Sequence, residues 1–363
     1  MLRAYKYRLY PNKEQSQMFA KTFGCVRFIW NNMLNDSNDF YCATDTLFIP
    51  TPAKYKSDYS FLKEVDSLAL ANAQMNLKKA YQAFFKKNSK KPKFKVKRNE
   101  QSYTTNMVNN NIKLLDNHIV IPKIGSVKIK LHRQLPLDST IKSITVRCNT
   151  IKQYYVSILV ETPDKPKEVV KVNSFLGLDF SMGEFYIDSE GKIANYPHFY
   201  KKTLQKISLL QQIQSKKTEY SKNYYRLQYK INKLYIKLVN QRTDFFYKKA
   251  NELYTQYDAI CVEDINLQDM SNKKSVYKYG KSISDNSFGA FRNILNNKGI
   301  LIKINKYYAS TQICSHCGEK HQIELSERTY RCPSCGLVIN RDYNAAINIK
   351  QEGQREYLKT RSA

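Results

Sequence analysis

The first ninety residues combine one alternating segment with two helical patterns. Residues 3–10 alternate between basic and apolar or aromatic side chains, which predicts a short strand that Pro11 ends. Large apolar residues then recur three or four positions apart from Phe19 to Met33 and again from Leu70 to Phe84. This spacing indicates two amphipathic helices. We therefore predict a helical bundle over residues 13–90, with these apolar faces as its core.

Residues 100–162 favour β-structure. The segments Ile141–Cys148 and Tyr154–Glu161 predict a hairpin, and Ile119–Ile121 with Val127–Lys130 predict a second strand pair. We expect a small barrel or sheet. Pro163-Asp-Lys-Pro166 follows and indicates a linker and a domain boundary.

From Asn173 onward, buried-type strands alternate with helical patterns. We expect strands at Phe175–Phe180, Glu184–Asp188, Lys192–Tyr196, Ala259–Glu263 and Ile300–Ile304. Helical patterns occupy residues 204–253 and 288–297, and a last helix begins at Asp342. This order is that of an RNase H-like core, in which the first and fourth strands are neighbours and the last helix packs across them.

Three acidic residues would converge in such a core. Asp179 lies near the end of the first strand, Glu263 ends the fourth, and Asp342 opens the last helix. Three carboxylates cannot crowd together without cations. Two Mg²⁺ ions about 3.5–4 Å apart would satisfy them and would activate water for phosphodiester cleavage. The three acids are therefore our candidate catalytic residues and Mg²⁺ ligands.

Three neighbouring acids fit the metal site less well. We expect a turn at Asp188 because the context Asp-Ser-Glu-Gly is typical of turns, a cap or turn at Asp258, and the opposite side of the sheet for Asp264.

Two Cys-x-x-Cys pairs precede Asp342. Their four thiolates, from Cys314, Cys317, Cys332 and Cys335, can close a tetrahedron around one structural Zn²⁺ ion. Gly318 and Gly336 follow the pairs and permit the positive φ that lets the backbone curl back toward sulfur. The alternative is four buried or disulfide-bonded cysteines. Because four thiolates fill the shell, we expect His316 and His321 at the surface.

The charge balance calls for a polyanionic partner. Sixty Lys and Arg against 31 Asp and Glu give a net charge of +29. Residues 86–98 carry eight cations, and Lys93–Lys97 alternates like a strand with one basic face. A solvated linker is the alternative for this segment. The candidate nucleic-acid contacts are Arg3, Lys6, Arg8, Lys93, Lys95, Lys97, Arg292 and Arg341. For the last two, salt bridges on a helix surface are an equal alternative.

Other classes of protein are disfavoured. The start of the chain has no secretory pattern, and no apolar run approaches twenty residues, so we expect neither secretion nor a membrane partner. Eight cysteines, four of them in a metal pattern, suit a reducing cytosol. We expect a cytoplasmic protein of bacterial type that associates with the nucleoid when bound to DNA. No coiled-coil seam indicates a dimer, so a monomer is favoured.

Four motifs along the chain are specific enough to compare with known families: Gly177-Leu-Asp179, Val262-Glu-Asp-Ile-Asn266, Ser310-Thr-Gln-Ile-Cys-Ser-His-Cys-Gly318 and Arg341-Asp-Tyr-Asn-Ala-Ala-Ile-Asn-Ile349. Together they resemble the TnpB family of transposon-encoded proteins, which are considered ancestors of type V CRISPR effectors. Tyr5–Pro11, Phe23–Asn31 and Asn240–Asp244 resemble further family segments. The sequence departs from the family at Ser181, where Gly is frequent, and at Asn340, where an acid is frequent.

The resemblance implies a multidomain α+β protein. Residues 1–12 and 92–170 would form a β-barrel-like wedge domain, and residues 13–91 a helical recognition domain. Residues 173–309 and 340–363 would form a RuvC-like nuclease domain of RNase H-like fold, with a zinc ribbon inserted at residues 310–339.

The implied activity is that of an RNA-guided DNA endonuclease. The protein would bind a guide RNA from the end of its transposon, recognise a short motif beside a double-stranded DNA target, and cut both strands. Two alternatives remain. A nuclease-inactive RNA-guided repressor should have lost one or more of the three acids. A DNA-binding transposase would not need a guide RNA, so co-purifying RNA would set it apart.

Overall fold

The computed structural model describes residues 1–163, 172–181, 183–264, 286–324 and 327–362. The chain divides into two compact units, residues 1–168 and 169–363. The predicted linker at Pro163–Pro166 lies, apart from Pro163, outside the described residues. In the described parts of the chain, no helix is long and apolar enough to cross a membrane.

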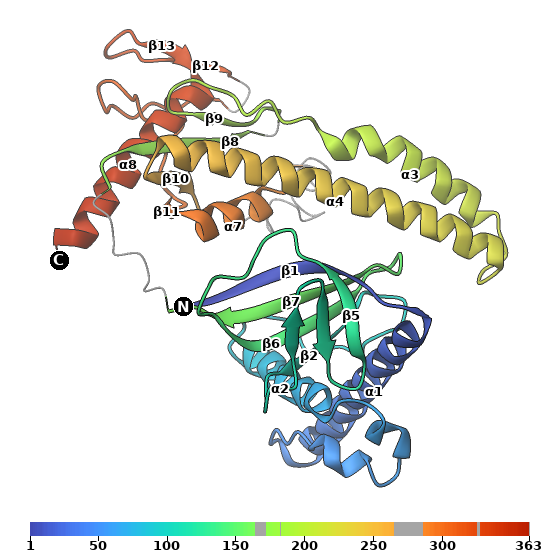
Figure 1. The fold of residues 1–363 in the computed structure, drawn as a ribbon. Helices are drawn as coiled ribbons and strands as arrows, with labels where there is room; N and C mark the ends of the chain where they lie inside the picture. Colours follow the sequence, from blue (N-terminus) through green and yellow to red (C-terminus); the bar gives the residue numbers. More distant parts are fainter. Residues whose placement is uncertain (164–171, 182, 265–285, 325–326, 363) are drawn as a thin grey trace. The chain divides into compact units, whose positions relative to one another are not determined.

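The first unit contains a seven-stranded antiparallel sheet (Figure 1). Its strand order is β2-β6-β7-β1-β5-β4-β3, so the strand from the chain's beginning lies at the centre. Both predicted strand pairs are confirmed, as β6 with β7 and β4 with β5. The strands are β1 (Leu2–Tyr10), β2 (Gln101–Asn106), β3 (Lys113–Leu115), β4 (His118–Ile121), β5 (Gly125–Lys130), β6 (Thr140–Cys148) and β7 (Tyr154–Glu161).

The helices of this unit cover one face of the sheet. They are α1 (Lys13–Thr44) and α2 (Ser67–Phe85), with 3₁₀ turns η1 (Pro52–Tyr55) and η2 (Ser60–Lys63) between them. Asn12 caps α1 with a capping box shared with Gln15. The predicted apolar face of α1 is buried, but the helices do not form a bundle of their own. Their buried residues share one hydrophobic core with the strands, because two helices alone cannot enclose their apolar faces.

The segment Lys93–Lys97 is not a strand, contrary to our expectation. It runs without ladder pairing and is fastened to α1. The side-chain amide of Asn31 donates to the Lys95 carbonyl oxygen at 3.0 Å and accepts from the Lys95 N–H at 2.8 Å. The Trp30 indole N–H donates to the Lys93 carbonyl oxygen at 3.1 Å. Side chains of a helix thus take the hydrogen bonds that a neighbouring strand would have made.

The second unit is built on a four-stranded sheet of order β11-β10-β8-β9. Its strands are β8 (Phe175–Ser181), β9 (Phe185–Asp188), β10 (Ala259–Glu263) and β11 (Ile300–Ile304). The strands β8 and β10 pair in parallel, as do β10 and β11, whereas β9 is antiparallel to β8. The predicted adjacency of the first and fourth strands is therefore confirmed.

The predicted third strand at Lys192–Tyr196 is wrong. Only one isolated bridge, between Ile187 and Ile193, joins this segment to the sheet. Asn195 has a φ of 54°, in the left-handed region, so the chain turns away before a ladder can form. Ala194 and Tyr196 are still buried, which explains why the segment has the apolar content of a strand.

Four helices complete the described part of this unit. They are α3 (Phe199–Ser215), α4 (Lys222–Gln256), α7 (Phe288–Lys298) and α8 (Arg341–Ser362). The helices α3 and α4 pack against each other and extend together beyond the sheet (Figure 1). A small hairpin of β12 (Thr329–Arg331) and β13 (Val338–Asn340) precedes α8.

The helix α8 lies very close to the sheet (Figure 1). A Cβ atom added at Gly177 of β8 would lie 2.1 Å from the Ala346 carbonyl oxygen and 2.7 Å from the Lys350 nitrogen. On the helix side, a Cβ atom at Gly353 would lie 2.4 Å from the Cys261 sulfur of β10. Two glycines therefore permit the close packing of α8 on β8 and β10.

Candidate functional site

The structure brings the three predicted acids to one place in the second unit. In the paired register, Val262 of β10 lies opposite Leu178 of β8. Glu263 and Asp179 each follow directly, so both stand just past the last paired residues of these two parallel strands. Asp342 lies in the first turn of α8, the helix that packs on these strands. Ligand sites in open α/β sheets commonly form beyond the carboxyl ends of such strands.

Each of two acids has defined hydrogen-bond partners. The Ser310 hydroxyl donates to Oε1 of Glu263. Arg341 donates from Nη2 to Oδ1 of Asp342 at 3.1 Å, and Nη1 of Arg328 lies 3.5 Å from Oδ2. Asn340 caps α8, because its side-chain oxygen accepts from the N–H groups of residues 342 and 343 at 3.0 Å. The departure from the family pattern at Asn340 is thus a helix cap.

The electrostatics indicate a site whose negative charge is only partly balanced. Burial, followed by the negative charges of Glu263 and Asp342, raises the pKa of Asp179 well above its usual range, and Arg341 opposes this only in part. Burial also raises the pKa of Glu263, although the Ser310 hydroxyl lowers it. Strong upward shifts among clustered carboxylates mark sites that require a proton or a cation.

The three acids offer a donor set made of carboxylate oxygen atoms alone. Hard cations such as Mg²⁺ prefer ligands of this kind.

The three neighbouring acids have partners of their own, and Asp188 forms the turn that we expected. Asp188 closes a turn by accepting from the N–H groups of Glu190 and Lys192, both at 2.9 Å. Asp258 accepts from the N–H groups of residues 173 and 174 and from the Ser174 hydroxyl, each at 3.0 Å. Asp264 is exposed and forms ion pairs with Arg292 at 3.2 Å and Lys303 at 3.6 Å.

The four cysteines form one cluster in the second unit. Their sulfur atoms all lie within 4.8 Å of one another, and the pairs Cys314–Cys335 and Cys317–Cys332 are each separated by 3.6 Å. None is disulfide-bonded. With Zn–S bonds of about 2.3 Å, the edges of a ZnS₄ tetrahedron would be about 3.8 Å, so the arrangement fits zinc.

The backbone around the cluster suits metal binding. Gly318 and Gly336 have φ values of 79° and 75°, as we predicted, and their N–H groups donate to carbonyl oxygens of the preceding turn. Although desolvation opposes ionisation, hydrogen bonds from Cys335 and from the Ser334 N–H lower the pKa of the Cys332 thiol to about 6. A thiolate is the form that binds metal.

One of the two histidines is placed differently from our expectation. His316 is exposed, as predicted. His321 is only half-exposed, and its Nε2 lies 3.5 Å from the Cys332 sulfur and 3.4 Å from the Ser334 hydroxyl oxygen. It therefore contacts the cluster from outside rather than standing free at the surface.

Three residues of the site escaped the sequence reasoning. Asn344 and Asn348 of α8 are completely buried and hold the loop that leads into Cys314. Ser310, the partner of Glu263, belongs to the same loop. The four-residue spacing of the asparagines on an otherwise apolar helix face was the signal that could have revealed them.

The first unit presents a basic face on its sheet. Strand register aligns Arg147 of β6, Tyr155 of β7, Arg8 of β1 and Lys130 of β5 in one row across four strands. The Arg8 guanidinium lies 4.8 Å from the centre of the Tyr155 ring, and the Lys6 ammonium lies 4.6 Å from it. At about 4.8 Å between strands, the row is about 15 Å long. Of its members, only Arg8 had been predicted.

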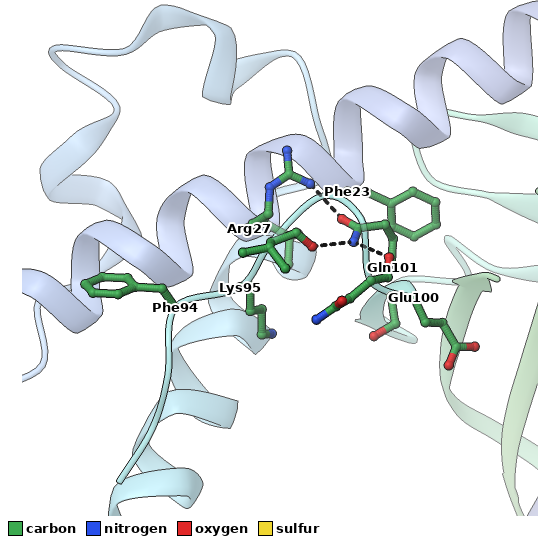
Figure 2. A pocket seen from close by; sticks show the side chains of 10 residues that line it. Phe23, Arg27, Phe94, Lys95, Glu100 and Gln101 are labelled. Carbon is green, nitrogen blue, oxygen red and sulfur yellow. Dashed lines mark hydrogen bonds between the residues drawn. The ribbon is translucent and has the colours of Figure 1, made fainter. Parts of the chain in front are cut away.

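Near Lys93–Lys97 a pocket opens between this segment and α1 (Figure 2). Within it, Arg27 donates to the Gln101 side-chain oxygen at 2.7 Å, and Gln101 in turn donates to the backbone carbonyl oxygens of residues 96, 97 and 99. The Lys95 ammonium lies 3.8 Å from the centre of the Trp30 ring, and partial burial lowers its pKa. Lys95 is thus partnered by protein, whereas Phe94 beside it is 55% exposed.

The remaining predicted contacts have varied surroundings. Arg3 lies on an exposed part of β1. Arg292 pairs with Asp264, and Arg341 pairs with Asp342 and donates to the Glu327 carbonyl oxygen at 2.8 Å. The salt-bridge alternative is therefore present for both, and whether they also contact nucleic acid stays a prediction.

The projecting pair α3 and α4 is a further basic surface. Residues 199–243 contain eleven Lys and Arg but one acid, Glu219. A groove between the two helices is lined by Lys202, Lys206 and Lys237. Tyr220 and Tyr225 near the tip are 73% and 55% exposed. Cations beside exposed aromatic rings are the surface that suits nucleic acid.

Comparison with known protein families gives three matches along the chain. Residues 1–45 match a model of the IS605 OrfB type described as a helix-turn-helix domain, although the structure has a strand and one unbroken helix there. Residues 157–274 match an IS605 OrfB model described as a probable transposase. Residues 288–349, which include the four cysteines and Asp342, match a Cas12f1-like TNB domain.

Individual proteins agree with these matches. A protein of Streptomyces pristinaespiralis, provisionally named an RNA-guided DNA endonuclease, is 25% identical over 97% of this chain and 89% of its own. The TnpB-like protein L79 of Acanthamoeba polyphaga mimivirus is 26% identical over 66% of this chain and 47% of its own.

The fold has a counterpart among solved structures. The chain in the cryo-EM structure of the Cas12f1–sgRNA–target DNA complex superimposes with a TM-score of 0.58 at 15% identity, over 93% of this chain and 83% of that one. This likeness establishes a multidomain α+β fold of the same kind. The family matches, the similar TnpB-like proteins and the motifs around Asp179, Glu263 and the cysteines together indicate that the chain belongs to the TnpB family.

Proposed function

We propose that this protein is an RNA-guided DNA endonuclease. Its catalytic site for phosphodiester hydrolysis would consist of Asp179, Glu263 and Asp342. The observation that carries the proposal is the meeting of two acids at the ends of neighbouring parallel strands with a third on the helix packed over them. The mutual effect of these acids on the pKa of Asp179 supports it. The name of the Streptomyces relative supports the guided activity.

The three carboxylates would hold two Mg²⁺ ions. When bound, the ions would supply an activated water and would stabilise the leaving oxygen. The protein's own residues prepare the site: the strand ends fix Asp179 and Glu263, and the capped first turn of α8 fixes Asp342. Arg341 limits the repulsion among the acids while no metal is present.

The cysteine cluster would hold one structural Zn²⁺ ion, and residues 310–339 would form the zinc ribbon. The distances between the sulfur atoms support this assignment. In the same scheme, residues 173–309 and 340–363 are the RuvC-like nuclease domain, residues 1–12 and 92–170 the wedge domain, and residues 13–91 the recognition helices.

Nucleic acid would contact two basic surfaces. The row from Arg147 to Lys130 would hold phosphates of the guide RNA or target duplex, with Tyr155 keeping Arg8 in place. The lysines of α3 and α4 would hold further backbone phosphates. The protein would then read a short target-adjacent motif, and pairing with the guide RNA would select the remaining sequence.

A purification and cleavage experiment tests the proposal. The protein is expressed with the DNA that flanks its gene, and bound RNA is extracted and sequenced. A defined RNA and Mg²⁺-dependent cuts in a matching plasmid support an RNA-guided nuclease. Guided binding without cuts would favour the repressor. Absence of RNA would favour the transposase, the alternative that the description of the match at residues 157–274 keeps open.

A further inference from the structure

We propose that Ser310 is a positioning residue for Glu263, and that through this serine the cysteine cluster orients the nuclease centre. The inference rests on the proposed function, because it assigns Glu263 a metal-binding role. It adds a residue and a coupling that the motifs of the three acids do not contain. The argument begins with the hydrogen bond between the two side chains.

The bond joins residues far apart in the sequence and is partly buried. Ser310 is 2% exposed, and its hydroxyl donates to Oε1 of Glu263. A carboxylate at the end of a strand can rotate about its terminal torsion with little cost. A donor fixed on one oxygen restricts that rotation and leaves the second oxygen for a ligand.

Ser310 itself is held by α8. The side-chain amide of Asn348 donates to the Ser310 carbonyl oxygen at 2.7 Å and to the Ile313 carbonyl oxygen at 2.6 Å. Asn344, one turn earlier, donates to the same Ile313 oxygen at 2.7 Å and accepts from the Ser315 N–H at 2.9 Å. Two buried amides therefore fasten the loop on both sides of Cys314.

The same helix carries Asp342. The proposed metal ligand Asp342 and the loop holders Asn344 and Asn348 belong to one continuous helix, so their spacing is fixed by its geometry. The far end of the loop is Cys314, one of the four clustered thiols. A metal in the cluster would hold Cys314 in position, and the loop would then hold Ser310 in position. Ser310 would in turn set the orientation of the Glu263 carboxylate relative to Asp342.

A purely structural serine would behave differently. It would stabilise the loop, and its removal would lower the melting temperature without altering how the acids bind a cation. A positioning serine changes the affinity for that cation, since loss of an outer partner of a metal ligand typically costs 10–100-fold in metal affinity or activity.

The test uses full-length protein and Mn²⁺ as the probe. Binding of Mn²⁺ is measured by electron paramagnetic resonance without nucleic acid, together with zinc content and thermal melting. We expect Ser310→Ala to weaken Mn²⁺ binding at least about 10-fold, Ser310→Thr to restore most of it by keeping a hydroxyl, and Thr311→Ala, the neighbouring control, to leave it unchanged. Removing the serine in a Glu263→Gln background should have no further effect.

A second variant tests whether the cysteine cluster influences Mn²⁺ binding. Cys335→Ser should also weaken Mn²⁺ binding. In the Ser310→Ala background the same substitution should weaken it much less, because the cluster acts on Glu263 through Ser310. Additive losses would overturn the coupling. An unchanged Mn²⁺ affinity in Ser310→Ala, with only a lower melting temperature, would overturn the positioning role.

The outcomes separate this inference from the proposed function. If the wild-type protein binds Mn²⁺ with an affinity that depends on Glu263 and Ser310 but never cuts guided targets, the inference stands and the nuclease proposal fails. If the wild type cuts and Ser310→Ala binds Mn²⁺ equally well, the nuclease proposal stands and the inference fails. A wild type that binds no Mn²⁺ would overturn the inference outright.

Discussion

Replacing Gly177 by alanine should separate α8 from the sheet. The added Cβ would lie 2.1 Å from the Ala346 carbonyl oxygen and 2.7 Å from the Lys350 nitrogen. Both are backbone atoms of a helix, so no change of rotamer can relieve the contact and the helix itself must move. Because β8 carries Asp179 and α8 carries Asp342, the displacement would act on the proposed metal centre.

The size of the effect follows from the kind of contact. Overpacking a core typically costs 1–3 kcal/mol, and a backbone contact this short puts Gly177→Ala at about 3 kcal/mol or more. For a unit of this size, each kcal/mol lowers the melting temperature by roughly 2–4 °C, so we expect a decrease of about 6–12 °C. Calorimetry would measure this decrease, and Mn²⁺ titration would show weaker binding.

The chain offers a matched control in the same unit. A Cβ at Gly183 would meet no atom within 4 Å, so Gly183→Ala should leave both melting and Mn²⁺ binding nearly unchanged. If Gly177→Ala melted within 2 °C of the wild type, the close packing of α8 on β8 would be refuted. A large loss of stability with unchanged Mn²⁺ affinity would instead refute the placement of Asp342 beside Asp179.

Three further predictions concern the charges and thiols. Cys332→Ser should lose the bound zinc, measured by metal analysis as a fall from one equivalent to near zero, and retained zinc would contradict the four-thiolate site. Replacing Arg147 and Lys130 by alanine should make the slope of log K for RNA binding against log salt concentration shallower by about 0.7–0.9 per lost phosphate contact, with the melting temperature unchanged. An unchanged slope would show that the row does not contact RNA. Asp179→Asn should raise the melting temperature without metal, because it relieves repulsion from Glu263 and Asp342, and should abolish stabilisation by Mg²⁺. A lower melting temperature without metal would argue against crowded carboxylates.

Sequence reasoning worked where local pattern and topology agree. The runs ending in Asp179 and Glu263 are short and apolar, so they could be predicted as buried strands, and the order of elements then predicted that they are neighbours. The cysteine cluster was equally predictable, since spacing of the pairs alone brings the thiols together.

It failed where hydrogen bonds over long sequence separations decide the structure. Lys93–Lys97 alternates like a strand, yet Trp30 and Asn31 of a helix take its backbone bonds. The segment Lys192–Tyr196 has apolar content but turns at Asn195. Ser310 meets Glu263 across 47 positions, and no periodic pattern predicts such a contact between one hydroxyl and one carboxylate.

Guided plasmid cleavage tests the central claim most directly. The particle purified with its RNA is mixed with Mg²⁺ and a plasmid that carries the guide-matched target beside randomised sequence, and the products are sequenced. We predict double-strand breaks at the matched target that disappear with EDTA and in Asp179→Ala, while this variant still binds the RNA. Cleavage that persists in Asp179→Ala, or that is independent of the guide, would contradict the account.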